Sequence, residues 1–253
     1  RMAIPMTESD HPVVPRPVSY VTEETRAGLA TRYGTRWLDS LGEIVAQESR
    51  RLDVSTERPL AGGRTACVLI VSGARGRFVL KLTPDLARSE REAAALVRLS
   101  AAGICPPIID VWTSRYGDLD YHGMAIGLVG DGTSVRDAPE LCPPVRALSD
   151  LLDTIAECGR KSLAVDLEPI TSHVRRGLDR GSGGGYRGAP KPDAQERANG
   201  YQALAILDRS LPSTWVHGTL HPANLVLDRG TRQLAIDPRT FLAHIANDPH
   251  AAR

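Results

Sequence analysis

The stretch WVHGTLHPAN, residues 215–224, places two histidines, a glycine, a proline and an asparagine at short spacing. The sequence directly after it, LVLDRGTRQLAID (residues 225–237), predicts a β-hairpin turned at residues 228–230. This hairpin would return Asp237 beside Asn224, and carboxylate and amide oxygens are the hard ligands that Mg²⁺ prefers. Taken alone, these residues favour a surface-turn aspartate and a loop-capping asparagine, and a magnesium site becomes the preferred interpretation only in the context of the surrounding pattern.

The composition of the chain narrows its possible partners. Its 31 basic and 30 acidic side chains nearly cancel, so the net charge does not predict nucleic acid binding. No run approaches the roughly 18 apolar residues that span a bilayer, and residues 1–17 lack the apolar core of a secretory signal. The four cysteines are scattered without a CxxC pair, which favours reduced thiols. We therefore expect a cytoplasmic protein with no membrane partner.

The first half of the chain changes its hydrophobic period more than once. Residues 1–21 are proline-rich and polar, and we expect an extended lead-in. Residues 22–52 have helical spacing, with a break at Gly34. Residues 67–82 predict two strands joined by a tight turn, residues 83–103 a helix, and residues 104–114 and 121–132 two more strands. We expect an N-lobe of helices and an antiparallel sheet over residues 22–131.

The second half is mainly helical. Residues 143–164 begin with prolines at a helix N-terminus and carry leucines on one face, and residues 194–210 predict another helix. Residues 180–193 are rich in glycine and proline without periodicity, which predicts a mobile loop. The expected fold class is α+β and two-lobed, with residues 132–253 forming a mainly helical C-lobe that contains loop 215–224.

This order of elements resembles the protein-kinase-like fold, and its details resemble the aminoglycoside phosphotransferase family, nearest the streptomycin and hydroxyurea kinase branch. That family carries a loop H-G-D-x-H-x-x-N, followed by a strand and I-D-P. The matching residues are His217, Gly218, Thr219, His221, Asn224, Ile236, Asp237 and Pro238. The resemblance implies a phosphotransferase that uses ATP and Mg²⁺, with Asn224 and Asp237 holding the metal and a small hydroxylated molecule as acceptor.

The resemblance also implies a phosphate-binding lysine in the N-lobe. Lys81 ends a predicted strand and would reach the α- and β-phosphates, oriented by a carboxylate on the next helix. Glu92 is the better match for that carboxylate, and Glu90 is the second choice. By itself, Lys81 would equally suit a lysine that flanks a strand in water.

Two further segments would contact the nucleotide. Gly62 and Gly63 would bring backbone N–H groups close to the phosphates, or they form an ordinary hairpin turn. The backbone from Ile126 to Leu128 would meet adenine, or it belongs to a plain buried strand.

Thr219 stands where the family has a catalytic aspartate, which orients the acceptor hydroxyl and receives its proton. Threonine does not take that proton near neutral pH, and general-base help is worth roughly 10²–10⁴-fold. Thr219 is either a natural divergence or an introduced inactivating change. The sequence thus predicts a kinase with impaired or abolished catalysis. The alternative is a degenerate kinase, or pseudokinase, that binds nucleotide or peptide as a subunit of a tailoring complex.

The end of the chain is the second departure from the family. NDPHAA, residues 247–252, resembles the remnant of a family motif with Asp248 retained, and the helices that follow it in relatives are absent. A truncated C-lobe is expected to expose an apolar patch, covered by a partner protein or by self-association. Alternatively, the natural protein continues beyond this sequence.

Overall fold

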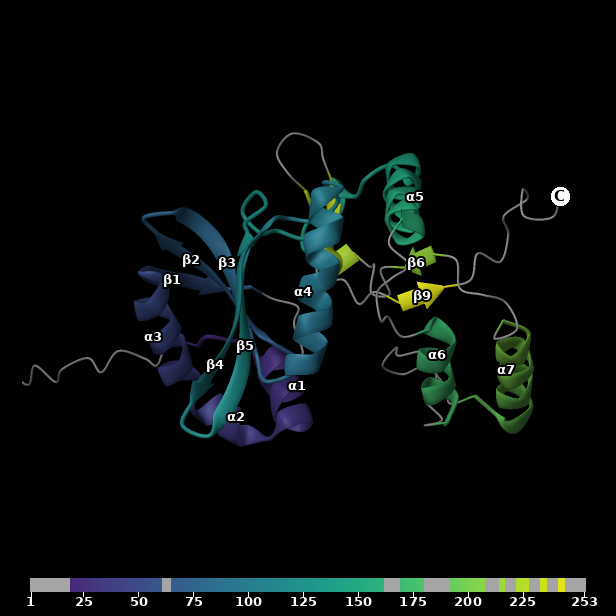
Figure 1. Cartoon of the computed structure of the whole chain (residues 1–253), viewed down its shortest axis with the longest axis horizontal. Helices are drawn as coiled ribbons and strands as arrows, with labels where there is room; N and C mark the ends of the chain where they lie inside the picture. The colour runs from purple at the N-terminus through teal and green to yellow at the C-terminus, as the bar shows by residue number, and fades with distance from the viewer. Residues whose placement is uncertain are drawn as a thin grey trace, which may run out of the picture.

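The computed structural model describes residues 19–60, 65–161, 169–179, 192–207, 214–216, 222–227, 233–235 and 241–243. The first half is a sheet with helices on both faces, and the helices of the second half lie beside it (Figure 1). This arrangement matches the expected α+β class, with a β-rich part followed by a mainly helical part.

The sheet of the first half is antiparallel, has five strands and follows the order β1-β2-β3-β5-β4. Its strands are β1 (Val54–Pro59), β2 (Cys67–Gly73), β3 (Gly76–Thr83), β4 (Ile108–Tyr116) and β5 (Leu119–Gly127). The predicted hairpin over residues 67–82 is confirmed, with Gly73 opposite Gly76, whose φ of 86° suits glycine. The sequence does not predict β1, because VSTERP is mostly polar and lacks an apolar alternation.

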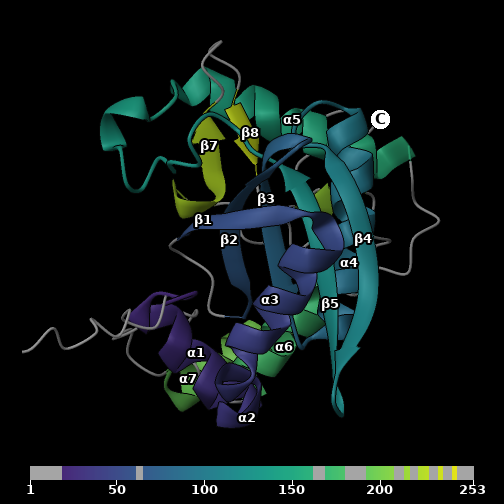
Figure 2. The same cartoon turned by 90° about the vertical axis from the view of Figure 1, so that its left-hand side faces the viewer.

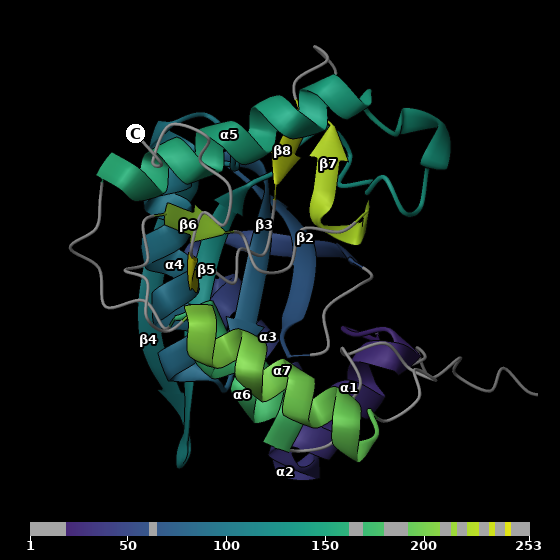
Figure 3. The ribbon, with the colours of Figure 1, turned by 90° about the vertical axis from the view of Figure 1, so that its right-hand side faces the viewer.

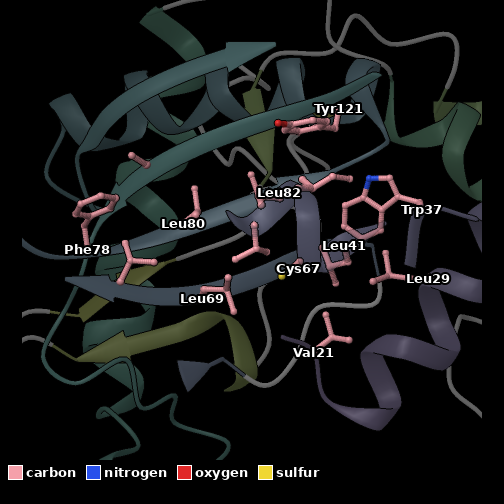
Figure 4. Close-up of a cluster of buried hydrophobic side chains, with 14 residues drawn as sticks. Val21, Leu29, Trp37, Leu41, Cys67, Leu69, Phe78, Leu80, Leu82 and Tyr121 are labelled. Carbon is pink, nitrogen blue, oxygen red and sulfur yellow. The ribbon is translucent and has the colours of Figure 1, made fainter. Parts of the chain in front are cut away.

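Three helices precede the sheet: α1 (Glu23–Tyr33), α2 (Thr35–Asp39) and α3 (Leu41–Leu52). Thr22 caps α1 by accepting a hydrogen bond from the Thr25 backbone N–H. The prediction of one continuous helix after Gly34 is wrong, because the chain breaks at Ser40. The break lies between Trp37 and Leu41, which both pack into the core beside the sheet (Figure 4). Tertiary packing here overrides local helical spacing.

The two faces of the sheet bury two different clusters. Alternate residues of β3 point to opposite faces, so Leu80 and Leu82 join the cluster formed with α1, α2 and α3. The other face packs against α4 (Leu86–Ala101), which contributes Leu96 and Leu99 to the second cluster. Figure 2 shows α3 in front of the sheet and α4 behind it. Lys81 lies between Leu80 and Leu82 and therefore points to the face that α4 covers.

Gly123 on β5 leaves room for the indole of Trp112 on β4, its partner across the strands. A Cβ at position 123 would lie 2.2 Å from Trp112 Cε2. A Gly123→Ala variant is therefore expected to lower the free energy of unfolding by about 1–3 kcal/mol, the usual cost of overpacking. Urea unfolding would measure it. Gly42→Ala in α3, where the nearest atom is 3.9 Å away, is the matched control, and equal stability of the two variants would contradict the prediction.

The second half contains α5 (Val145–Lys161), α6 (Ile170–Asp179) and α7 (Ala194–Leu207). Figure 3 shows these helices in front of the sheet, with α6 and α7 next to one another. Asp193 and Glu196 form a reciprocal capping box at the start of α7, in agreement with the predicted helix. The sequence does not predict α6 as a separate element. Of the predicted mobile loop, residues 180–191 lie outside the described residues.

Short strands complete the second half. The two strands of the predicted hairpin after residue 224 are confirmed: β7 (Leu225–Leu227) pairs antiparallel with β8 (Gln233–Ala235). The predicted turn at residues 228–230 lies outside the described residues. A second pair, β6 (Thr214–Val216) with β9 (Phe241–Ala243), is absent from the prediction. Three-residue strands that pair across a long sequence separation leave no local pattern to detect.

Some large apolar side chains of the second half are exposed. They lie on different helices: Val145 and Leu152 on α5, Val174 on α6 and Ile206 on α7. Nothing in the structure identifies what would cover them, so a protein partner or self-association stays a prediction. Across the described residues, no helix combines the length and apolar character that a membrane span requires.

Candidate functional site

Lys81 and Glu92 form a buried ion pair between β3 and α4. Lys81 Nζ lies 2.5 Å from Glu92 Oε1, and the two side chains are only 9% and 6% exposed. Glu90, the second choice from the sequence, is on the exposed face of α4. The helix therefore brings Glu92, and not Glu90, to the lysine. Burying two charges costs free energy unless each has good hydrogen-bonding partners. A lysine that only ends a strand would more commonly be in water, so the burial of this pair is unusual.

A cavity of about 350 Å³ opens beside this pair. Its size is within the range of small-molecule sites. The sheet supplies one wall, and residues 132–137 with residues 223–226 supply much of the other. The lining residues are Arg58, Leu60, Thr65, Ala66, Val68, Val79, Lys81, Glu92, Leu96, Pro106, Ile126, Gly127, Leu128, Val129, Gly132, Thr133, Ser134, Asp137, Ala223, Asn224 and Val226.

The strand register separates an aliphatic part of the cavity from a charged part. Val79 lies opposite Ile126, and Lys81 lies two residues farther along β3, opposite Val68 and Met124. The aliphatic side chains therefore gather toward the end of β5. The ammonium and carboxylate of the ion pair lie farther along the sheet.

The segment after β5 turns where the sequence predicts a longer strand. β5 ends at Gly127, whose backbone N–H donates to the Pro107 carbonyl at 2.8 Å. Ile126 and Leu128 both line the cavity, and contact of this segment with adenine stays a prediction. Among the described residues, no hydrogen-bond acceptor is found for the backbone N–H groups of Leu128 and Val129.

Asn224 reaches the same cavity from the other half of the chain. It ends a 3₁₀ turn (Pro222–Asn224), is 8% exposed and lines the cavity. Backbone hydrogen bonds fix this turn to the segment after β5: Arg136 N–H donates to Pro222 O and Val135 N–H to Leu225 O. The end of loop 215–224 thus lies across the cavity from the sheet.

Several residues singled out in the sequence lie outside the described residues. They are Gly62, Gly63, His217, Thr219, His221 and Asp237. Leu60 and Thr65, which flank the glycine pair, both line the cavity. Within the described part of the chain, no group of three or more His, Cys, Asp or Glu side chains is arranged to hold a metal ion.

Among the cavity residues that the sequence did not single out are Arg58, Ser134 and Asp137. Arg58 Nη2 donates to the Asp131 carbonyl at 2.7 Å, linking β1 to the segment after β5. Ser134 Oγ donates to Asp137 Oδ2 at 2.7 Å, and this hydrogen bond lowers the pKa of the Asp137 carboxyl. The Ser-x-x-Asp spacing carries a weak signal for such a local contact, whereas β1 itself gives none for Arg58.

Comparison with known proteins agrees with this geometry. The model of the phosphotransferase enzyme family matches residues 56–240, a range that includes the sheet, the ion pair and the Asn224 turn. No curated protein matches the chain. A crystal structure of an aminoglycoside-3'-phosphotransferase of type VIII is similar at 20% sequence identity, over 78% of this chain and 76% of that one, with a TM-score of 0.47.

The chain belongs to the phosphotransferase enzyme family, and its fold is protein-kinase-like. The expected family is thereby confirmed. Its streptomycin and hydroxyurea kinase branch stays a prediction.

Proposed function

We propose that this chain binds ATP with Mg²⁺ in the cavity and transfers the γ-phosphate to a hydroxyl of a small molecule, at a rate limited by Thr219. One observation carries the proposal: the buried Lys81–Glu92 pair and Asn224 line the same cavity from opposite halves of the chain. Phosphoryl transfer requires positioning and charge neutralisation more than covalent chemistry, and these groups suit that work.

Lys81 is suited to hold phosphate oxygens. Its ammonium is compact, carries three donors and is fixed in direction by Glu92 at 2.5 Å. In a mostly buried setting the attraction between an ammonium and a phosphate is stronger than in water. Lys81 would therefore bind the α- and β-phosphates and hold them in one orientation.

The aliphatic part of the cavity is suited to a purine. Val79 on the sheet and Val226 on β7 line it from both halves of the chain. Backbone N–H groups at Leu128 and Val129 would supply directional recognition of the adenine edge. Gly62 and Gly63, between the cavity-lining residues Leu60 and Thr65, would bring backbone close to the phosphates.

Asn224 and Asp237 are the proposed Mg²⁺ ligands. The amide oxygen of Asn224 is a hard donor at the cavity wall, and Mg²⁺ needs only one or two protein ligands when phosphates supply others. The ion would neutralise charge on the phosphates. Because none of the four cysteines forms a disulfide, we place the reaction in the cytoplasm, where thiols stay reduced.

Calorimetric titration of the chain with Mg·ATP tests the proposal, together with a radiolabelled phosphate-transfer assay on hydroxylated aminoglycosides. We expect saturable binding with a Kd of roughly 1 μM to 1 mM, the usual range for enzyme substrates, and slow transfer. Absence of Mg·ATP binding would overturn the nucleotide assignment. Binding without transfer to any acceptor would overturn the catalytic part alone.

The second candidate is a degenerate kinase that serves as a nucleotide- or peptide-binding subunit, and Thr219 is the observation that favours it. Affinity capture with a defined substrate peptide, compared with a scrambled peptide, distinguishes it from the first. The subunit role requires specific peptide binding with no phosphorylated product. Phosphate transfer to a small hydroxylated acceptor would rule it out.

A further inference from the structure

We propose that a buried hydrogen bond between Ser89 and His122 positions α4, and through it the Lys81–Glu92 pair, for binding nucleotide phosphates. This inference rests on the proposed function. It assigns a role to two polar residues that lie outside the cavity and touch no proposed ligand.

The geometry of this contact is well defined. Ser89 Oγ lies 2.8 Å from His122 Nδ1, and the two residues are 1% and 3% exposed. Ser89 lies on α4 one turn before Glu92, so both side chains project from the same buried face. His122 lies on β5 opposite Thr83, whereas Lys81 lies opposite Met124, the next residue on the same face. Two polar contacts, one helical turn apart on α4, thus join this helix to neighbouring strands: Ser89 contacts β5, and Glu92 contacts β3.

The N-terminus of α4 is held by Asp85, which caps the helix and accepts a hydrogen bond from Tyr33 Oη at 3.1 Å, whereas the rest of its buried face is mostly apolar. Its other buried residues are alanines and leucines: Ala93, Ala95, Leu96 and Leu99. Apolar packing is non-directional, and small side chains allow a helix to shift along a sheet. Hydrogen bonds are directional. The Ser89–His122 bond therefore fixes the position of α4 along the sheet, and with it the place where Glu92 meets Lys81.

The ionisation state of His122 gives this arrangement a measurable signature. Burial lowers the pKa of His122 below its usual range, and the negative charge of Glu90 partly opposes this effect. Ser89 of α4 hydrogen-bonds the ring, and Thr83 and Thr113 are the cross-strand partners of His122. Glu90, on the exposed face of α4, acts on the ring through its charge alone. Because the folded-state pKa is below the unfolded value of about 6.5, the neutral ring stabilises the fold above that pH. This stabilisation is lost as the pH falls toward the folded pKa.

The experiment compares Kd values for Mg·ATP and for adenosine, which lacks phosphates, at pH 7.5. Ser89→Ala is expected to weaken Mg·ATP binding about 3- to 10-fold, the range that one hydrogen bond supplies, with less than about a twofold change for adenosine. Ile44→Val, in the cluster on the opposite face of the sheet, controls for a loss of stability alone. Equal weakening of both ligands by Ser89→Ala, or unchanged Mg·ATP affinity, would overturn the inference.

His122→Asn provides the second test, because its side chain keeps a hydrogen-bonding group near the position of Nδ1 but does not titrate. This variant should retain Mg·ATP affinity at pH 7.5. Between pH 7.5 and 5.5, its ratio of Mg·ATP to adenosine affinity should fall less than that of the unaltered chain. Parallel pH profiles would contradict the proposed role. If the unaltered chain binds neither ligand, the proposed function itself fails. This outcome differs from the results with Ser89→Ala or His122→Asn that would contradict only the role of the hydrogen bond.

Discussion

A Thr219→Asp variant is expected to transfer phosphate to a hydroxyl acceptor about 10²–10⁴-fold faster than the unaltered chain, because aspartate supplies the missing general base. The gain corresponds to about 3–5 kcal/mol of activation free energy. Mg·ATP affinity should change little, since the residue acts on the acceptor. Single-turnover transfer at saturating Mg·ATP measures the chemical step directly.

Thr219→Asn is the matched control for this variant. Asparagine has nearly the same shape as aspartate and accepts hydrogen bonds, but it does not take up the proton near neutral pH. If orientation of the acceptor alone limits the reaction, the Asn and Asp variants will be equally fast. That result would contradict the general-base explanation, and no acceleration in either variant would place the defect elsewhere in the chain.

Lys81→Met is expected to lower kcat/KM about 10²–10³-fold, the usual cost of losing one electrostatic contact to the reacting group. The comparison is best made in the Thr219→Asp background, where turnover is easier to measure. Methionine keeps the length and apolar stem of lysine and removes the ammonium that lies 2.5 Å from Glu92. Arg91→Met, which removes an equal charge from the exposed face of α4, is expected to leave kcat/KM unchanged.

Stability must be separated from phosphate binding in this experiment. Removing the ammonium beside the buried Glu92 carboxylate is costly, about 3–5 kcal/mol for buried pairs in general. The double variant Lys81→Met with Glu92→Gln relieves much of this cost, because both charges are gone. We expect the double variant to recover thermal stability without recovering kcat/KM. Recovery of both would show that Lys81 serves the fold and not the phosphates.

The choice between two acidic residues shows the limit of sequence reasoning. Glu90 and Glu92 are two residues apart, so on a helix they point to different sides. Helical periodicity alone did not establish which side faces the sheet. The folded chain settles this, because α4 packs Leu96 and Leu99 against the sheet and thereby turns Glu92 toward Lys81.

Local patterns were sufficient wherever the deciding interactions are close in sequence. The β2–β3 hairpin follows from two β-rich runs around a glycine turn, and α7 lies within the helix predicted over residues 194–210. The family also follows from a short stretch, because the residues of loop 215–224 and the aspartate after the next hairpin keep a recognisable spacing.

The sequence by itself determined the secondary elements with strong periodicity, the family and most of the candidate residues. Only the tertiary structure decided the pairing of β6 with β9, the position of the polar strand β1 and the contact of Arg58 with Asp131. It also decided that Ser134 and Asp137 share a cavity with Lys81. These features depend on contacts between distant segments, which a local sequence pattern does not record.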